Sequence, residues 1–135
     1  MPRAAGFSAC VLLVIAAGCT RDEDYVQVMR DQRTARREVA EILAAVTDEK
    51  SMVEAKAKLA EQSKKIDAIA ARAKALPQPL PSSVAERMRD EAIAVQTQLE
   101  RLAEEMQRIK KLPGGSEFCK QLETDAPGLL SAVQK

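Results

Sequence analysis

Three cysteines, Cys10, Cys19 and Cys119, carry the side chains of this chain that are best suited to covalent chemistry. A thiol can be alkylated or oxidised to a disulfide, and its surroundings decide which reaction is favoured. The 135 residues contain no histidine, which excludes Ser–His and Cys–His nucleophile pairs and removes the commonest ligand of transition metals. The chemistry of the chain therefore depends on what surrounds each cysteine.

Cys10 and Cys19 belong to the first twenty residues, which are mostly apolar. The apolar run covers residues 4–18, follows the single charge of Arg3 and ends just before the charged residues 21–24. About 20 apolar residues are needed to cross a bilayer, so this run is too short for a comfortable transmembrane helix. A short run of this kind after a positive charge is typical of a secretory signal peptide.

The end of the run, Ile15-Ala16-Ala17-Gly18-Cys19, resembles the lipobox of bacterial lipoproteins. The resemblance implies that residues 1–18 are removed and that Cys19 carries a diacylglyceryl thioether, with palmitate or a similar acyl chain on the new amino terminus. Ala16 departs from the usual pattern, in which leucine is common at that position. Two or three acyl chains anchor a protein stably, because each buried methylene contributes about 0.8 kcal/mol. The alternative is an ordinary secretory signal with an unmodified Cys19.

The same resemblance predicts a location in the cell envelope, with residues 19–24 as lipid anchor and short tether. In enterobacterial lipoproteins, an aspartate after the lipidated cysteine implies retention at the inner membrane, whereas this chain has Thr20. The periplasmic face of the outer membrane is therefore favoured, and the inner membrane is the alternative. The mature part also resembles small helical lipoproteins of bacteria.

Cys119 would be the one thiol left after processing and lipidation. An odd cysteine in an exported protein indicates either pairing between chains or a free thiol. Its neighbours Phe118 and Leu122 favour a small apolar side chain packed under the end of the chain. A disulfide that joins two copies into a homodimer is the alternative.

Long helices are expected to position these residues, because the chain is rich in Ala, Glu, Lys, Leu and Arg. Turn formers at residues 47–51 and three prolines within 76–81 interrupt the helical pattern. Ser51 and Ser83 each stand three residues before a glutamate, a capping-box pattern that predicts a helix start. Pro113 and the glycines after it end the third segment.

The expected helices span about residues 22–47, 51–76 and 83–112, within a bundle of residues 25–112. In each of them, apolar residues recur at spacings of three and four, as in the narrow seams of coiled coils. Antiparallel pairing of neighbouring seams keeps one register throughout, with Val39, Leu59 and Leu102 in one layer. We predict an all-α fold: an antiparallel three-helix up-down-up bundle, followed by a short C-terminal helical tail over residues 113–135.

The short tether would hold one end of this bundle at the membrane. That end is expected to contain Tyr25, residues 76–84 and Met88, whereas residues 47–51 and 110–116 lie at the far end. Leu80 and the nearby prolines form either a contact site for lipid or a partner, or only a tight connection between helices.

Charge and composition exclude several classes of function. The 21 basic and 20 acidic residues give a net charge of +1, which lacks the basic excess of nucleic-acid-binding proteins. Two Phe, one Tyr and no Trp leave no platform on which bases could stack. No phosphate-binding, zinc-protease or serine-hydrolase motif occurs, so we predict no catalytic residue, no cofactor and no metal site.

The sequence therefore favours a non-enzymatic, membrane-anchored helical lipoprotein that binds an envelope protein or braces the envelope. One alternative is a carrier that holds a small molecule or a lipid between its helices, although the seams are narrow and rich in alanine. Another is a tether attached to peptidoglycan through Lys135, because the short wall-bound lipoprotein of enteric bacteria resembles this chain in ending with lysine. The Tyr-Arg pair that precedes the lysine there is missing here.

Overall fold

The computed structural model describes residues 17–77 and 79–130, with side chains described from Asp22 onward. Within these ranges all regular secondary structure is helical, which confirms the predicted all-α class. Five helices follow one another: α1 (Ala17–Ala44), α2 (Glu49–Ala75), α3 (Ser82–Lys110), α4 (Gly115–Asp125) and α5 (Pro127–Leu130).

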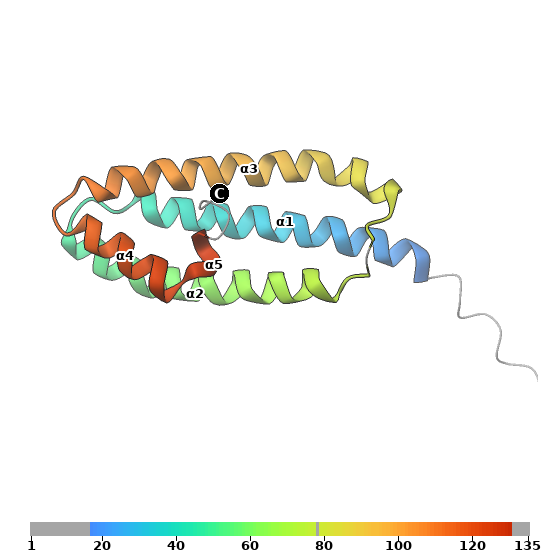
Figure 1. The fold of residues 1–135 in the computed structure, drawn as a ribbon, viewed down its shortest axis with the longest axis horizontal. Coiled ribbons are helices and arrows are strands. Elements are labelled where there is room, and N and C mark those ends of the chain that lie inside the picture. The colour runs from blue at the N-terminus through green and yellow to red at the C-terminus, as the bar shows by residue number, and fades with distance from the viewer. Residues whose placement is uncertain (1–16, 78, 131–135) are drawn as a thin grey trace, which may run out of the picture.

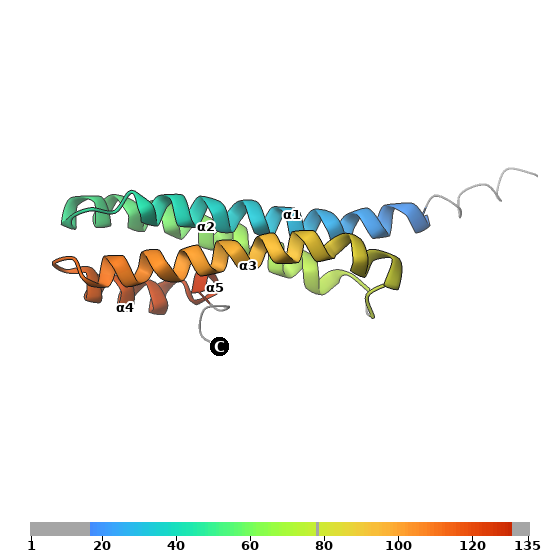
Figure 2. The ribbon, with the colours of Figure 1, turned by 90° about the horizontal axis from the view of Figure 1, so that it is seen from above.

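The three long helices lie side by side as an elongated stack (Figure 1). α1 lies between α2 and α3 in this view and packs on both. The α1–α2 and α3–α4 connections lie at one end of the molecule, and the α2–α3 connection lies at the other. Figure 2 shows α4 and α5 on the side of α3 that faces away from α1.

The segment after Leu112, expected as a tail, supplies part of the core instead. Its buried side chains belong to the same apolar cluster as Leu59 of α2 and Leu102 of α3. They are Phe118, Cys119, Leu122, Ala126, Leu129 and Leu130. Within the described residues, α4 packs on both α2 and α3, whereas α2 and α3 make few close contacts with each other. The predicted direct pairing of α2 with α3 is therefore wrong, because α4 and α5 pack where the partner seam was expected.

The first turn of α2 begins earlier than the pattern at Ser51 predicts. Asp48 is the N-cap: its carboxylate accepts a hydrogen bond from the Ser51 backbone N–H at 2.8 Å. Ser51 Oγ in turn accepts one from the Asp48 backbone N–H at 3.0 Å, which completes a reciprocal capping box. Ser51 is thus the third residue of the helix. Ser83 also does not cap α3, because α3 begins at Ser82 and its N-cap is Pro81; the Ser83 hydroxyl instead donates to Asp22.

The cap at Asp48 predicts a dependence of stability on pH. Hydrogen bonds from the Ser51 backbone and side chain lower the pKa of Asp48. A carboxyl whose folded pKa lies below its unfolded value stabilises the fold above the unfolded pKa, and this contribution is lost as pH falls through the folded pKa. Between about pH 4.5 and pH 2.5, the Tm of the wild type should therefore fall roughly 3 °C further than that of Asp48→Asn.

Thermal melts followed by circular dichroism check this expectation. The side-chain amide introduced by Asp48→Asn would still cap the helix but cannot titrate, so the comparison isolates the ionisation of one carboxyl. An identical drop of Tm in the two proteins would contradict the proposed contribution of the cap.

Candidate functional site

The end of the bundle that holds the start of α1 also holds the α2–α3 connection (Figure 1). Tyr25 and Val26 of α1 form a small buried cluster with Val84 of α3. Leu76, Leu80 and Met88 pack against this cluster and are partly buried. The structure thus brings together Tyr25, the connection and Met88, the residues that the sequence places nearest to the anchor.

Leu80 does not protrude from this end. Its side chain is partly buried against the cluster around Tyr25, and the Tyr25 hydroxyl donates a hydrogen bond to the carbonyl of Pro77. These contacts favour the second interpretation of Leu80, a tight connection, over an exposed contact site. Pro77 and Pro79 beside it are exposed.

Ion pairs join α1 to α3 next to the cluster. Glu23 lies 2.8 Å from Arg87 and 3.2 Å from Arg30, and the hydrogen bond from Arg87 lowers the pKa of Glu23. Glu91 of α3 lies 3.4 Å from Arg30 and 2.8 Å from Arg33. Arg30 and Arg87 are exposed and Arg33 is partly exposed, so each pair contributes little to stability. Together they fix the level of α3 along α1.

The predicted lipidation site, Cys19, falls within the first turn of α1. Residues 1–16 of the predicted signal peptide lie outside the described residues, as does Lys135, and the side chains of residues 17–21 are not described. Over the described ranges 17–77 and 79–130, we find no helix with the length and apolar character needed to cross a bilayer.

Cys119 is packed in the core and is fully buried. Its Sγ lies 3.8 Å from the carbonyl oxygen and 3.9 Å from the sulfur of Met106. Burial raises the pKa of the Cys119 thiol, which keeps it protonated and unreactive. A disulfide to a second chain would require α4 to leave the bundle. The structure therefore favours the packed thiol over the homodimer disulfide.

We expect Cys119 of the native protein to react with a maleimide at least about 100-fold more slowly than the same residue in urea. Both access of the reagent and the fraction of thiolate are reduced in the folded state. Peptide mass spectrometry would locate the label at residue 119 and give its rate under the two conditions. Equal rates would contradict the buried position.

Sequence reasoning missed Arg36, a charged residue of α1 that is only 8% exposed. Its Nη1 donates a hydrogen bond to the carbonyl of Leu129 at 2.8 Å, and burial lowers the pKa of Arg36. Carbonyls in the last turn of a helix lack intrahelical partners, so Arg36 satisfies one of them in α5. One feature of the sequence could have indicated that Arg36 is buried. Ala40 and Leu43 follow Arg36 at helical spacing and form a second apolar seam, and both are buried.

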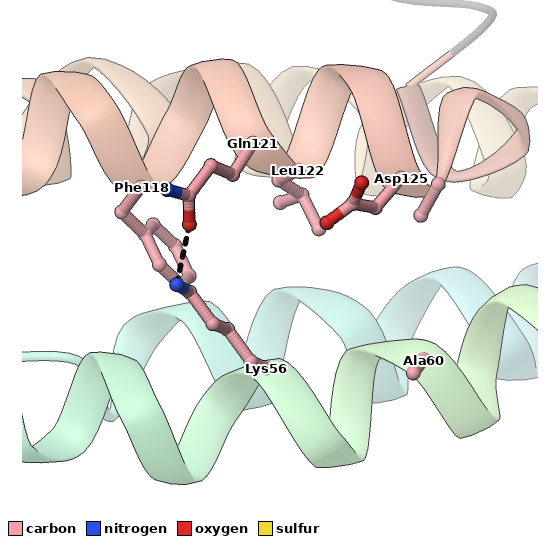
Figure 3. A pocket seen from close by; sticks show the side chains of 7 residues that line it. Lys56, Ala60, Phe118, Gln121, Leu122 and Asp125 are labelled. Atoms are coloured by element: carbon pink, nitrogen blue, oxygen red, sulfur yellow. Dashed lines mark hydrogen bonds between the residues drawn. The ribbon is translucent and has the colours of Figure 1, made fainter.

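A small pocket opens between α2 and α4 (Figure 3). Lys56 of α2 donates a hydrogen bond to the side-chain oxygen of Gln121 of α4 across this gap. The pocket has a volume of about 100 Å³, and its lining residues are Lys56, Ala60, Phe118, Gln121, Leu122, Asp125 and Ala126. Sites for drug-sized ligands usually have volumes of roughly 300–1,000 Å³, so this pocket has room only for a much smaller group.

Two further pockets between described residues have volumes of about 60 and 150 Å³ and are also small. Across residues 17–77 and 79–130, no group of three or more His, Cys, Asp or Glu side chains is placed to hold a metal ion. No family model, no curated protein and no solved structure matches this chain.

Proposed function

We propose that this protein is a non-enzymatic lipoprotein of the cell envelope that acts as a protein-interaction or structural module. In this proposal α1, α2 and α3 form an up-down-up antiparallel bundle, completed by α4 and α5 and anchored by lipid on Cys19. The observation that carries the proposal is the lipobox-like motif Ile15-Ala16-Ala17-Gly18-Cys19, whose cysteine precedes the buried Tyr25 of α1 by only a few residues. The anchor and the bundle would then be one continuous element.

The orientation of the bundle follows from this continuity. Because only a few residues separate Cys19 from the buried Tyr25, the end that contains Pro77 and Leu80 faces the lipid surface. The opposite end, where the Glu49 side chain lies beside Gly114, faces away from it. The periplasmic face of the outer membrane is the favoured location, and the inner membrane is the alternative.

A role in binding or bracing is favoured over that of a carrier for a small molecule or a lipid. The apolar faces of α2, α3 and α4 are buried against one another, and the pockets described above are too small for an acyl chain or a drug-sized ligand. An envelope protein would therefore bind to the outer surface of the bundle. Attachment to peptidoglycan through Lys135 is kept as the lesser alternative.

Metabolic labelling with radioactive palmitate in a bacterial host tests the anchor. The wild type should incorporate label and sediment with membranes, whereas Cys19→Ser should incorporate none, because a hydroxyl does not form the thioether. Cys119→Ser is the matched control and should be labelled like the wild type. An unlabelled wild type, or label that persists in Cys19→Ser, would refute the proposal.

A further inference from the structure

The outward face of α3 is acidic and carries one large apolar side chain. Its residues follow one another at spacings of three and four, on the side of the helix opposite to the buried Leu99 and Leu102, and all are exposed. They are Glu86, Asp90, Ile93, Thr97, Glu100 and Glu104. Ile93 is 59% exposed, and none of the four carboxylates forms an ion pair with another described residue. Exposed Arg89 and Arg101 flank this face, and Gln96 donates a hydrogen bond to Glu100 at 3.2 Å. Along its centre the face offers carboxylates without ion pairs around an apolar side chain.

The outward face of α2 has the complementary character. Its side chains on the side opposite to the buried Leu59 and Ile66 are small or apolar apart from Lys50 and Lys64. They are Lys50, Val53, Ala57, Lys64, Ala68, Ala71 and Ala75, all exposed. Lys64 has no ion pair within the described residues. The face thus combines positive charge with room for a large side chain of a neighbour.

Contacts with α1 show which parts of the two faces lie at the same level along the bundle. Arg30 and Arg33 of α1 both bind Glu91 of α3, while Asp31 binds Arg72 of α2 at 2.7 Å. Glu91 and Arg72 therefore lie at one level. Ile93 and Ala71, their close neighbours in sequence, share this level on the outer faces.

A second level is set in the same way. Lys65 of α2 lies 3.1 Å from Glu38 of α1. Hydrogen bonds between α1 and α3 pair residues that are 61 to 65 positions apart, from Asp22 with Ser83 to Leu43 with Arg108. That offset places Glu100 of α3 within about one helical turn of the level of Glu38, and hence of Lys64.

In the view of Figure 1, α3 lies above α1 and α2 lies below it, so the outward faces of α2 and α3 point away from each other in this view. Two copies that stand side by side in the same orientation thus present the α2 face of one to the α3 face of the other. In this arrangement opposite charges meet, and the residues compared above lie at similar heights along the two bundles. Lipid anchors at the same end of every copy would enforce both the common orientation and the common height, so this step rests on the proposed function.

We propose that the occupant of these faces is a second copy of this chain. Ile93 of one copy packs against Ala68 and Ala71 of the next, and Glu100 pairs with Lys64. Alanine side chains leave room for the larger isoleucine, while the charges select orientation and register. Because the contact is heterologous, it leaves one face of each kind free, and copies extend into a row at the lipid surface.

Cysteine crosslinking of the full chain in a bacterial host tests the contact. Ala71→Cys and Ile93→Cys are combined with Cys119→Ser and treated with a short bismaleimide. Ala71 is an exposed residue of α2 and Ile93 an exposed residue of α3, and a product with the mass of two or more chains on a denaturing gel reports a contact between copies. We expect a ladder of dimers and larger species, and at least a fivefold lower yield from either single variant. Ala57→Cys with Ile93→Cys, a pair at unequal levels, is the matched control.

Charge reversal gives the second measurement. Lys64→Glu should lower the yield of the ladder at least fivefold, and Lys64→Glu with Glu100→Lys should restore it, since the pair is then reversed but complementary. A ladder that is absent, that forms equally from the mismatched pair, or that ignores the charge reversal would overturn the contact. Palmitate incorporation into the same samples separates the two proposals: labelled protein without a ladder refutes self-association only, whereas a ladder without label refutes the anchor only.

Discussion

A chain that stops at Leu112 should lose most of its stability. The removed segment buries Phe118, Leu122, Leu129 and Leu130 against the core faces of α2 and α3. Full burial of each such side chain contributes about 1.5–3 kcal/mol, partly offset by the entropy of ordering the segment. Since small domains have only about 5–15 kcal/mol of net stability, we expect a Tm lower by at least roughly 15 °C, or no cooperative transition.

Complementation separates loss of contacts from a general effect of shortening. A peptide of residues 113–135, added to the shortened chain, should raise its Tm in a concentration-dependent manner, because binding to the folded state stabilises it. Circular dichroism at several peptide concentrations measures this effect. A shortened chain that melts like the wild type would show that α4 and α5 are not part of the core.

The second large effect is expected at Arg36. Arg36→Met keeps an unbranched side chain of similar length but removes the donor to the Leu129 carbonyl. A buried carbonyl left without a partner costs about 1–3 kcal/mol, and the hydrogen bond from a charged group is lost as well. The variant also no longer buries a charge, which offsets part of this cost. We expect a net destabilisation of roughly 1–3 kcal/mol, measured by urea unfolding.

Arg37→Met is the matched control for this measurement. Arg37 is exposed, and among the described residues its one ion pair is a 3.7 Å contact with Glu41 on the same helix, so its replacement should change stability by less than about 0.5 kcal/mol. Equal effects of the two substitutions, or a more stable Arg36→Met, would show that the contact with Leu129 does not hold α5 in place.

The long helices were predictable because each carries a clear apolar seam between strong breaks. The predicted seam of α2 is confirmed from Met52 to Ile69, which are buried. In α3 the prediction holds for Leu99 and Leu102, whereas Ala92 is exposed although it continues the same spacing. Alanine fits a seam and a surface equally well, so its spacing carries little information about burial.

Two features of the fold, the start of α2 and the packing of α4, were not predicted correctly from the sequence. Ser51 fits a capping pattern with Glu54, but Asp48 is an equally good cap, and the reciprocal hydrogen bonds form between Asp48 and Ser51. The core role of α4 was missed because its helix is short, and a short apolar pattern such as Phe118 and Leu122 is common in exposed segments too. Whether such a segment is buried or exposed depends on how it packs on α2 and α3.

The candidate site was predictable only in part. The grouping of Tyr25, Leu80 and Met88 followed from the expected connection of the helices, and the structure brings these residues together. The partner of Arg36 could not be predicted, since Leu129 lies 93 positions away and its contact depends on how α5 packs.

The intact mass of the protein purified from bacterial membranes tests the central claim most directly. The account predicts a chain that begins at Cys19 and whose mass exceeds that of the polypeptide by a diacylglyceryl group and a further acyl chain, with all added mass on the peptide that contains Cys19. A chain that retains residues 1–18, or one that begins elsewhere with an unmodified Cys19, would contradict it.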